Sequence, residues 1–335
     1  MNKANPLIPF AADPWLKSGH AQTLYGALGW KPAVPAPGHA LKIAVDAENA
    51  LLCYHHQART NNPACLVLLH GLEASADAPY MVSSAHKALS VGLDVLRVNL
   101  RGCGNSHHLS RTSYHGGLSG DIEAILRFLH QHFGYRQLMI AGFSLGAHLA
   151  LKLAGQLAAQ APEYLKGIVA ISPPLKLGIT SEGLLHPSRR LYERYFFKSM
   201  IQTHYQRRRL WPEYASLEPL KKVHNMYDFD EYITAPGFGY KDAQDYYTQN
   251  SAIQWLHQIQ VPTQIIFAID DPIIPFAMHQ QAMETPHPYV HWLLSAEGGH
   301  VGFFNSKLLS LQDRDRLWAE NRMIDACLDW IYEIP

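Results

Sequence analysis

Residues 138–151 read LMIAGFSLGAHLAL, and within them Ser144 stands between Gly142 and Gly146. An apolar run precedes this serine, and small residues follow it. We expect the chain to turn sharply there from a buried strand into a helix, because glycines at the ±2 positions avoid the clashes that such a turn creates. This turn, the nucleophile elbow G-x-S-x-G, exposes a serine hydroxyl at the carboxyl edge of a sheet.

Short apolar runs alternate with helical patterns on both sides of this stretch, which is typical of parallel βαβ units. The sequence predicts an α/β fold with a mostly parallel central sheet flanked by helices, in a single domain over residues 1–335. Strands are expected near 65–70, 93–100, 137–143, 167–173, 263–270 and 289–295, after a hairpin of 41–46 and 50–56. Helices are expected near 79–91, 119–133, 145–160 and 311–331.

About ninety residues separate the fourth and fifth of these parallel strands, more than a crossover needs. We expect a helical insertion at 175–255 that forms a lid or cap over the end of the sheet. Its stretch PSRRLYERYFFKSMIQTHYQRRRLWPEY (187–214) is aromatic and basic. The helical spacing of Tyr192, Tyr195 and Phe196 predicts an apolar helix face that packs on the domain. The run of Arg207, Arg208 and Arg209 is interpreted as a face exposed to solvent.

A serine hydroxyl needs a neighbouring base and an acid that orients that base. His300 lies in the glycine-rich stretch LSAEGGHVGFF, just after the last expected strand. Asp270 and Asp271 follow the preceding strand in QIIFAIDDPIIP. We favour Asp271 as the acid, with Asp270 as the alternative. The chain order Ser, Asp, His is characteristic of α/β-hydrolases.

Acyl transfer also requires donors for the negatively charged oxygen of the tetrahedral intermediate. One candidate is the backbone amide of Leu145, directly after Ser144 at the start of a helix. The other is the amide of Leu72, which follows His70-Gly71 at the end of an earlier strand. The sequence therefore predicts an oxyanion hole formed by Leu72 and Leu145.

Several motifs occur in a fixed order along the chain: PWLKSGHAQT (14–23), LLHGLEAS (68–75), NLRGCGNS (99–106), YHGGLSGD (114–121), GFSLGA (142–147), DDP (270–272) and GGHVGFF (298–304). Together they resemble the YheT-like branch of the α/β-hydrolases, which includes bacterial predicted hydrolases and eukaryotic lipid esterases and acyltransferases. The resemblance implies carboxylic-ester hydrolase chemistry, with Ser144, Asp271 and His300 at the positions of the family's catalytic triad. It implies no particular substrate.

Other residues in these motifs are expected to support the site rather than to take part in chemistry. His20 is expected near the site. Asp121 is interpreted as the N-terminal cap of a helix. Arg101 together with Asn105 is expected to brace the loop beside the pocket.

The composition and charge of the chain exclude several classes of protein. The formal charge is zero, with 28 basic and 28 acidic residues, which argues against bulk nucleic-acid binding. The chain lacks a signal-peptide pattern and an apolar run long enough for an integral membrane segment, so we expect a cytoplasmic protein. Peripheral membrane contact and oligomeric state stay open. The 20 histidines lack metal-ligand spacing, and no metal or other cofactor is expected.

The hypothesis drawn from these residues is a serine esterase that acts on a small-molecule ester, with an apolar acyl chain suggested by the aromatic insertion. One alternative is an acyltransferase that passes the same acyl-enzyme to an alcohol. Another is a ligand-binding hydrolase scaffold without catalysis. A peptidase or thioesterase also stays open, because a triad alone does not select the leaving group.

Overall fold

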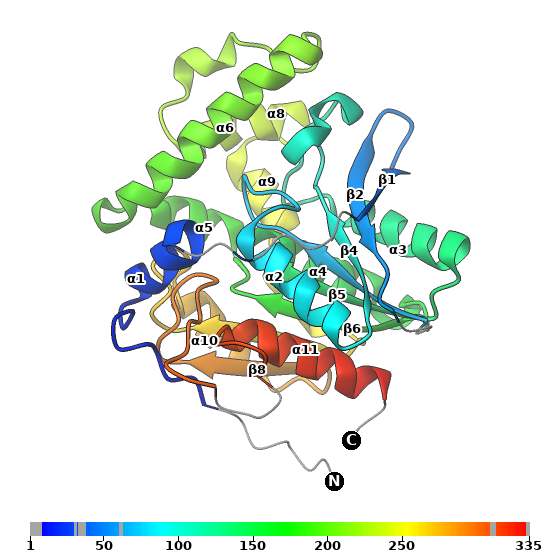
Figure 1. Cartoon of the computed structure of the whole chain (residues 1–335). Coiled ribbons are helices and arrows are strands. Elements are labelled where there is room, and N and C mark those ends of the chain that lie inside the picture. The colour runs from blue at the N-terminus through cyan, green and yellow to red at the C-terminus, as the bar shows by residue number, and fades with distance from the viewer. Residues whose placement is uncertain (1–8, 30–31, 33–37, 60–62, 309–312, 333–335) are drawn as a thin grey trace.

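The computed structural model describes residues 9–29, 32, 38–59, 63–308 and 313–332. Its centre is an eight-stranded sheet in the order β1-β2-β4-β3-β5-β6-β7-β8 (Figure 1). The expected hairpin is formed by β1 and β2, β2 also pairs antiparallel with β4, and the pairs from β4 to β8 are parallel. The strands are β1 (His39–Ala44), β2 (Ala50–His56), β3 (Ala64–Leu69), β4 (Asp94–Val98), β5 (Gln137–Phe143), β6 (Leu165–Ile171), β7 (Thr263–Ala268) and β8 (Val290–Ser295).

Helices cover both faces of the sheet, as the sequence predicts. Side chains alternate along each strand, so Leu66 and Leu68 pack with α2 (Pro79–Ser90) and α11 (Trp318–Ile331) on one face. Val67 and Leu69 pack on the other face with α3 (Ser119–Phe133) and α4 (Leu145–Leu157). These two apolar layers account for the continuous hydrophobic runs of the central strands.

The helix expected at 311–331 begins later than the sequence pattern indicates. The structure starts α11 at Trp318, with Leu317 at its N-cap position. The amide of Leu317 donates a hydrogen bond to the side-chain carboxylate of Asp315 at 2.8 Å rather than to a carbonyl of a helical turn. Residues 309–312 lie outside the described part of the chain.

The segment between β6 and β7 contains only helical elements. We call its residues 175–255 the insertion segment. In Figure 1 its long helix α6 crosses the molecule beyond one end of the sheet, with α8 and α9 beside it. Its elements are α5 (Leu177–Leu184), η4 (Pro187–Arg189), α6 (Arg190–Leu210), η5 (Pro219–Lys222), α7 (Met226–Phe229), η6 (Asp230–Thr234), α8 (Ala235–Gly237), α9 (Ala243–Asn250) and η7 (Ala252–Gln254).

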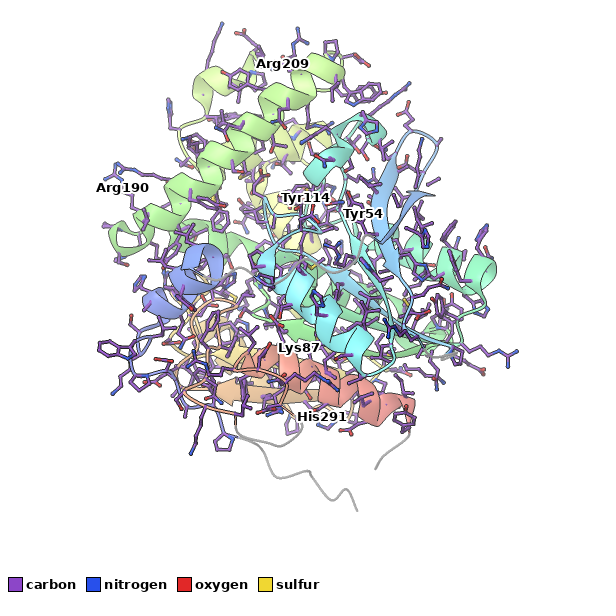
Figure 2. All side chains as sticks on the ribbon, in the orientation of Figure 1. Tyr54, Lys87, Tyr114, Arg190, Arg209 and His291 are labelled. Atoms are coloured by element: carbon purple, nitrogen blue, oxygen red, sulfur yellow. The ribbon has the colours of Figure 1, made fainter. Side chains whose placement is uncertain are left out.

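The arginine run at the end of α6 is not wholly a solvated face, so that interpretation was wrong for Arg207. Arg207 is buried and donates hydrogen bonds to the carbonyls of Ser110 and Arg111. Burial lowers the pKa of Arg207 to about 10. Arg209 is exposed, and Figure 2 shows it and Arg190 projecting outward from the two ends of α6.

The remaining helices are short connectors around the sheet. They are α1 (Gly19–Leu24), η1 (Tyr25–Gly29), η2 (Gly104–Leu109), η3 (Ala158–Gln160), η8 (Leu256–Gln258) and α10 (Ala277–Met283). All four cysteines are buried free thiols. Within the described residues, no helix has both the length and the apolar character that crossing a bilayer requires.

Candidate active site

Ser144 occupies the turn between β5 and α4. Its backbone has φ +51° and ψ −117°, a region that a non-glycine residue rarely adopts, and its amide donates to the carbonyl of Ile171 at 2.9 Å. The flanking glycines are sterically required. A Cβ at Gly142 would lie 2.4 Å from the backbone of Gly146, and a Cβ at Gly146 would lie 2.5 Å from the carbonyl oxygen of Leu69.

His300 and Asp271 form a buried pair. His300 Nδ1 lies 2.8 Å from Asp271 Oδ2, and the side chains are 8% and 0% exposed. The other carboxylate oxygen, Oδ1, accepts hydrogen bonds from the amides of Ile273 and Ile274 at 2.8 and 2.9 Å. Because an ionised carboxylate only accepts, Nδ1 of a neutral His300 carries the proton and Nε2 keeps its lone pair.

The neighbouring carboxylate, Asp270, has a different contact. Its Oδ1 accepts a hydrogen bond from the amide of Gly299 at 2.9 Å. Gly298 and Gly299 both have positive φ, so the loop that carries His300 depends on glycine and on this hydrogen bond. Of the two aspartates considered from the sequence, the structure pairs Asp271 with His300.

Helix α1 supports the same loop. Thr23 Oγ1 accepts a hydrogen bond from the amide of His300 at 2.8 Å and donates to the carbonyl of Gly19 at 2.6 Å. A Cβ at Gly19 would lie 2.0 Å from the carbonyl oxygen of Asp270, so the helix lies directly against the loop after β7. Thr23 lies in the SGHAQT motif, but the motif alone does not indicate this hydrogen-bonding role.

Ser144 and His300 line one large cavity of about 700 Å³, which we call the histidine cavity. Among the described residues, the structure records no hydrogen bond between the Ser144 hydroxyl and the His300 ring. The two side chains therefore share a cavity, and their hydrogen bond is not formed in this state. Catalytic hydrogen bonds often become short only when substrate is bound.

The two amides expected as an oxyanion hole flank Ser144. Leu145 is the first residue of α4, where backbone amides lack intrahelical partners. Leu72 lines the same cavity as Ser144. Gly71, just before Leu72, lies so close that a Cβ there would be 3.1 Å from Ser144 Cβ. In the described part of the chain, no hydrogen-bond acceptor is recorded for either amide.

His70 holds the loop that carries Leu72. Its Nε2 accepts a hydrogen bond from the amide of Leu100 at 3.1 Å, so Nδ1 bears the proton and donates to the carbonyl of Gly71 at 2.7 Å. Burial lowers the pKa of His70 to about 4 and keeps the ring neutral. The amide of Gly71 donates to Tyr80 Oη at 3.0 Å. His70 belongs to the LLHGLEAS motif, but the motif alone does not indicate this positioning role.

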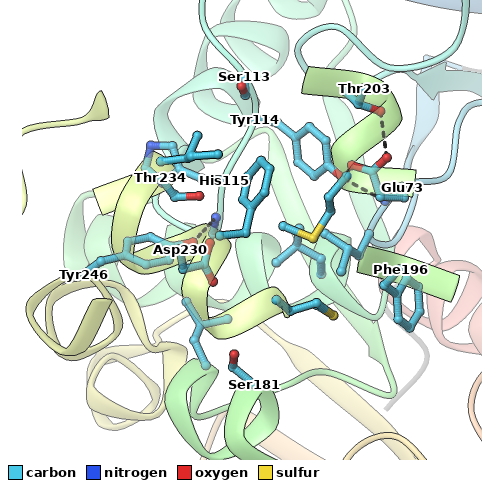
Figure 3. A pocket seen from close by; sticks show the side chains of 18 of the residues that line it. Glu73, Ser113, Tyr114, His115, Ser181, Phe196, Thr203, Asp230, Thr234 and Tyr246 are labelled. Atoms are coloured by element: carbon cyan, nitrogen blue, oxygen red, sulfur yellow. Dashed lines mark hydrogen bonds between the residues drawn. The ribbon is translucent and has the colours of Figure 1, made fainter. Parts of the chain in front are cut away.

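Glu73 connects the same loop to the insertion segment (Figure 3). It has φ +52°, and its Oε2 accepts hydrogen bonds from Ser199 at 2.9 Å and Thr203 at 2.8 Å, both on α6. Its Oε1 accepts from Tyr114 at 3.0 Å. The position of α6 is thereby tied to the backbone beside Leu72.

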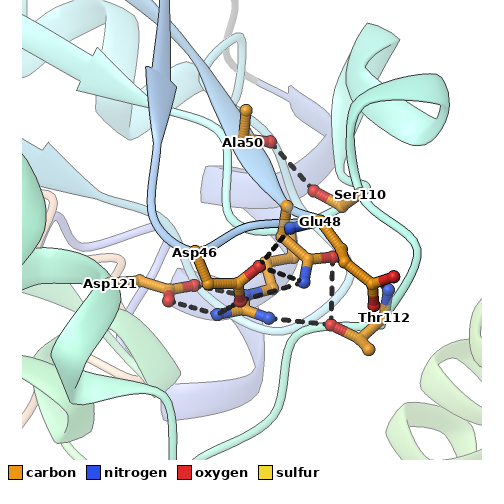
Figure 4. A network of polar contacts seen from close by, with 8 residues as sticks. Asp46, Glu48, Ala50, Ser110, Thr112 and Asp121 are labelled. Carbon is orange, nitrogen blue, oxygen red and sulfur yellow. Dashed lines mark hydrogen bonds and ion pairs between the residues drawn. The ribbon is translucent and has the colours of Figure 1, made fainter.

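Two supporting residues have partners other than those expected. Asp121 lies in the first turn of α3, where it accepts two hydrogen bonds of 2.6 Å from Arg101 (Figure 4). The N-cap of α3 is Leu118, so the prediction that Asp121 caps this helix was wrong. Arg101 also contacts Asp46 and Thr112. Within the described residues, no hydrogen bond from Arg101 to Asn105 is recorded, and the loop is held through Asp121 instead.

His20 lies near the site, as expected, and contacts the insertion segment. Its Nδ1 is 2.8 Å from Tyr192 Oη, and its ring stacks on the Tyr192 ring at 5.7 Å between centroids. Tyr192 is a buried residue of α6 that also lines the histidine cavity. This contact joins α1 to α6 beside the loop of His300.

The family model for the alpha/beta hydrolase fold matches residues 65–307, which include Ser144, Asp271 and His300. The chain belongs to the α/β-hydrolase family. It is 32% identical over 270 residues to YheT of Escherichia coli, which is named as an esterase, and the match covers 80% of this chain and 77% of YheT. The resemblance to the YheT-like branch is thereby confirmed.

More distant relatives carry lipase names. A monoacylglycerol lipase of Saccharomyces cerevisiae is 27% identical over 72% of this chain and 55% of its own length. The phospholipase ABHD3 of Mus musculus is 27% identical over 71% of this chain and 58% of its own. The solved structure of the Pyrococcus furiosus esterase Pf2001 has a TM-score of 0.58 at 16% identity, and the match covers 90% of this chain and all of that one. This last likeness concerns the fold.

Proposed function

We propose that this chain is a serine carboxylic-ester hydrolase with Ser144 as nucleophile, His300 as general base and Asp271 as the acid that orients His300. The observation that carries the proposal is the buried His300–Asp271 pair at 2.8 Å, together with the cavity that both His300 and Ser144 line. The names of the relatives, esterase and lipase, support the same class.

In the proposed mechanism, Nε2 of His300 takes the proton of the Ser144 hydroxyl as Ser144 attacks the ester carbonyl. The amides of Leu72 and Leu145 bind the negatively charged oxygen of the tetrahedral intermediate. The imidazolium, stabilised by Asp271, then gives its proton to the departing alcohol oxygen, which leaves an acyl-enzyme on Ser144. His300 next activates water, which releases the acid and restores Ser144.

We also propose that the insertion segment acts as a lid that shapes the acyl site. Its helix α6 contributes Phe196 and Met200 to the lining of a cavity that Ser144 also lines. These side chains support an acyl group larger than acetyl, because burying each additional methylene favours binding by about 0.8 kcal/mol.

A panel of p-nitrophenyl esters of graded acyl length tests this function. We expect hydrolysis that increases from acetate to longer chains, that is lost in Ser144→Ala and that persists in Ser188→Ala, a change at an exposed serine. Activity retained in Ser144→Ala would contradict the proposal. Product analysis in the presence of glycerol separates hydrolysis from acyl transfer, since transfer yields an acylglycerol rather than free acid.

A further inference from the structure

A second cavity meets the first at Ser144. This cavity, of about 190 Å³, lies between the sheet edge and the insertion segment, and we call it the insertion cavity. Ser144 lines both cavities, whereas His300 lines only the histidine cavity. The six residues common to both linings are Leu72, Glu73, Ser144, Phe196, Thr203 and Ile273.

The position of His300 indicates which cavity holds the alcohol half of an ester and which holds the acyl half; this step rests on the proposed function. The imidazolium must reach the leaving oxygen in order to protonate it. The alcohol half therefore lies in the histidine cavity. The acyl half then extends to the other side of Ser144, into the insertion cavity.

The wall of the insertion cavity is not uniformly apolar. Figure 3 places Glu73 and Thr203 on one side of it and Asp230 and Thr234 on the other. Asp230 comes from η6 of the insertion segment, and Ser181 of α5 also lines the cavity. A carboxylate thus faces the space that would receive the acyl group.

Asp230 has no cationic partner among the residues that the structure describes. Its Oδ2 accepts a hydrogen bond from Tyr247 Oη at 2.8 Å, and Tyr247 Oη lies 3.0 Å from Ser181 Oγ. Within the described residues, no ion pair of Asp230 is recorded, and burial raises its pKa to about 6 while Thr234 and Tyr247 act in the opposite direction. An ionised carboxylate offers about four acceptor positions, so further donors can bind.

The other charged side chains of this cavity have protein partners. Glu73 accepts hydrogen bonds from α6 and Tyr114, and Arg207 donates to two backbone carbonyls. Holding a carboxylate away from bulk water without an ion-pair partner costs stability. A carboxylate retained in a cavity at that cost is typical of a ligand-binding group.

We propose that Asp230 recognises an O–H or N–H donor on the acyl half of the substrate. The preferred substrates are then esters whose acyl chain carries a hydroxyl or amino group, rather than esters of unsubstituted alkanoic acids. The carboxylate binds the donor in the insertion cavity, and the ester carbonyl lies at Ser144.

Matched p-nitrophenyl esters test this proposal. The set comprises alkanoates of about six to ten carbons and their ω-hydroxy and ω-amino counterparts. We expect wild-type kcat/KM to be about tenfold or more higher for a hydroxy or amino ester than for the alkanoate of equal length. Equal values across the whole set would overturn the proposal, while hydrolysis of the alkanoates that depends on Ser144 would leave the proposed function standing.

Two variants of Asp230 distinguish recognition of a hydroxyl donor from recognition of an amino donor. Asp230→Leu removes the acceptor and should abolish the preference while alkanoate hydrolysis persists. Asp230→Asn keeps an acceptor oxygen without charge, so a preference for hydroxy esters should survive in large part and a preference for amino esters should not. Glu213→Gln, at an exposed carboxylate of the insertion segment, is the control and should leave the ratios unchanged. A preference that persists in both Asp230 variants would also overturn the proposal.

Discussion

At the scale of single residues, the site depends on which ring nitrogen of each histidine bears a proton. Asp271 fixes the proton of neutral His300 on Nδ1, and the Leu100 amide fixes the proton of His70 on Nδ1 as well. The first leaves Nε2 of His300 free to act as a base. The second anchors the Gly71 carbonyl and hence the orientation of the next amide, that of Leu72.

Asp271→Asn should therefore impair turnover without preventing folding. An asparagine can present its amide hydrogens to Nδ1, which would move the ring proton to Nε2 and remove the base. We expect kcat to fall by about 10⁴-fold, measured on a p-nitrophenyl ester. Asp270→Asn keeps an acceptor for Gly299 and should cost much less. Equal losses in the two variants would contradict the assignment of the acid.

Gly146→Ala should destabilise the protein, because its Cβ would meet the Leu69 carbonyl oxygen at 2.5 Å. We expect a loss of about 1–3 kcal/mol in the free energy of unfolding, measured by urea denaturation. Gly120→Ala is the matched control, since a Cβ at that helical glycine meets nothing within 4 Å and should be neutral or stabilising. Similar effects of both changes would refute the steric explanation of the elbow.

At the scale of elements, the loop after β3 and helix α6 are joined through Glu73. Three hydroxyl groups, those of Ser199, Thr203 and Tyr114, donate to one carboxylate. Hydrogen bonds to a charged acceptor are stronger than neutral ones. The placement of the Leu72 amide therefore depends on where α6 lies.

Glu73→Gln should lower kcat more than it raises KM, because a Gln amide nitrogen cannot accept from the α6 hydroxyls. We expect a decrease of about tenfold in kcat, less than the loss of about 10²–10³-fold that follows when an oxyanion donor is removed. Steady-state kinetics on a short-chain ester give both constants. Lys198→Gln on the exposed side of α6 should change neither, and an unchanged kcat in Glu73→Gln would show that α6 and the loop are independent.

The elements that the sequence predicts well are those whose own residues decide them. The apolar run of β5 and the periodic pattern of α3 place both elements at the expected bounds, 137–143 and 119–133. The start of α11 and the N-cap of α3 were misplaced, because tertiary partners contribute to both; the amide of Trp318, for example, donates to the carbonyl of Phe303 at 3.0 Å. Asp121 resembles a cap residue, but its carboxylate binds Arg101, which comes from a distant loop.

The residues of the candidate site likewise divide into those that local motifs indicate and those whose roles depend on tertiary partners. Ser144, Asp271 and His300 occur in local motifs at strand ends, so the sequence indicates them. Glu73 and Thr23 lie within quoted motifs, but their roles depend on partners from remote elements that the motifs do not indicate. No local pattern marks Asp230. The arrangement of two cavities around Ser144 arises only when the insertion segment packs against the sheet edge.

At the scale of the whole molecule, several buried histidines make stability depend on pH. Burial lowers the pKa of His70 to about 4, of His115 to about 3 and of His279 to about 4. Such groups stabilise the fold above their unfolded pKa of about 6.5, and this contribution is lost as the pH falls toward the folded values. Carboxyl groups whose pKa is raised by burial, among them Asp230, Asp121 and Glu320, act in the opposite direction.

We therefore expect the free energy of unfolding to fall by about 2 kcal/mol or more from pH 7 to pH 5, measured by urea denaturation. His279→Gln should make this dependence shallower. His291→Gln, at an exposed histidine, should leave the dependence unchanged. Equal or greater stability at pH 5 would show that the buried histidines do not govern acid unfolding.

The central claim is that Ser144 is a nucleophile activated by His300. Reaction with a fluorophosphonate, followed by intact-mass measurement and peptide mapping, tests this claim most directly. We expect one adduct per chain, located on Ser144, and labelling that is slowed by a factor of about 10³ or more in His300→Ala. An adduct on another residue, or labelling of Ser144 at an unchanged rate in His300→Ala, would contradict it.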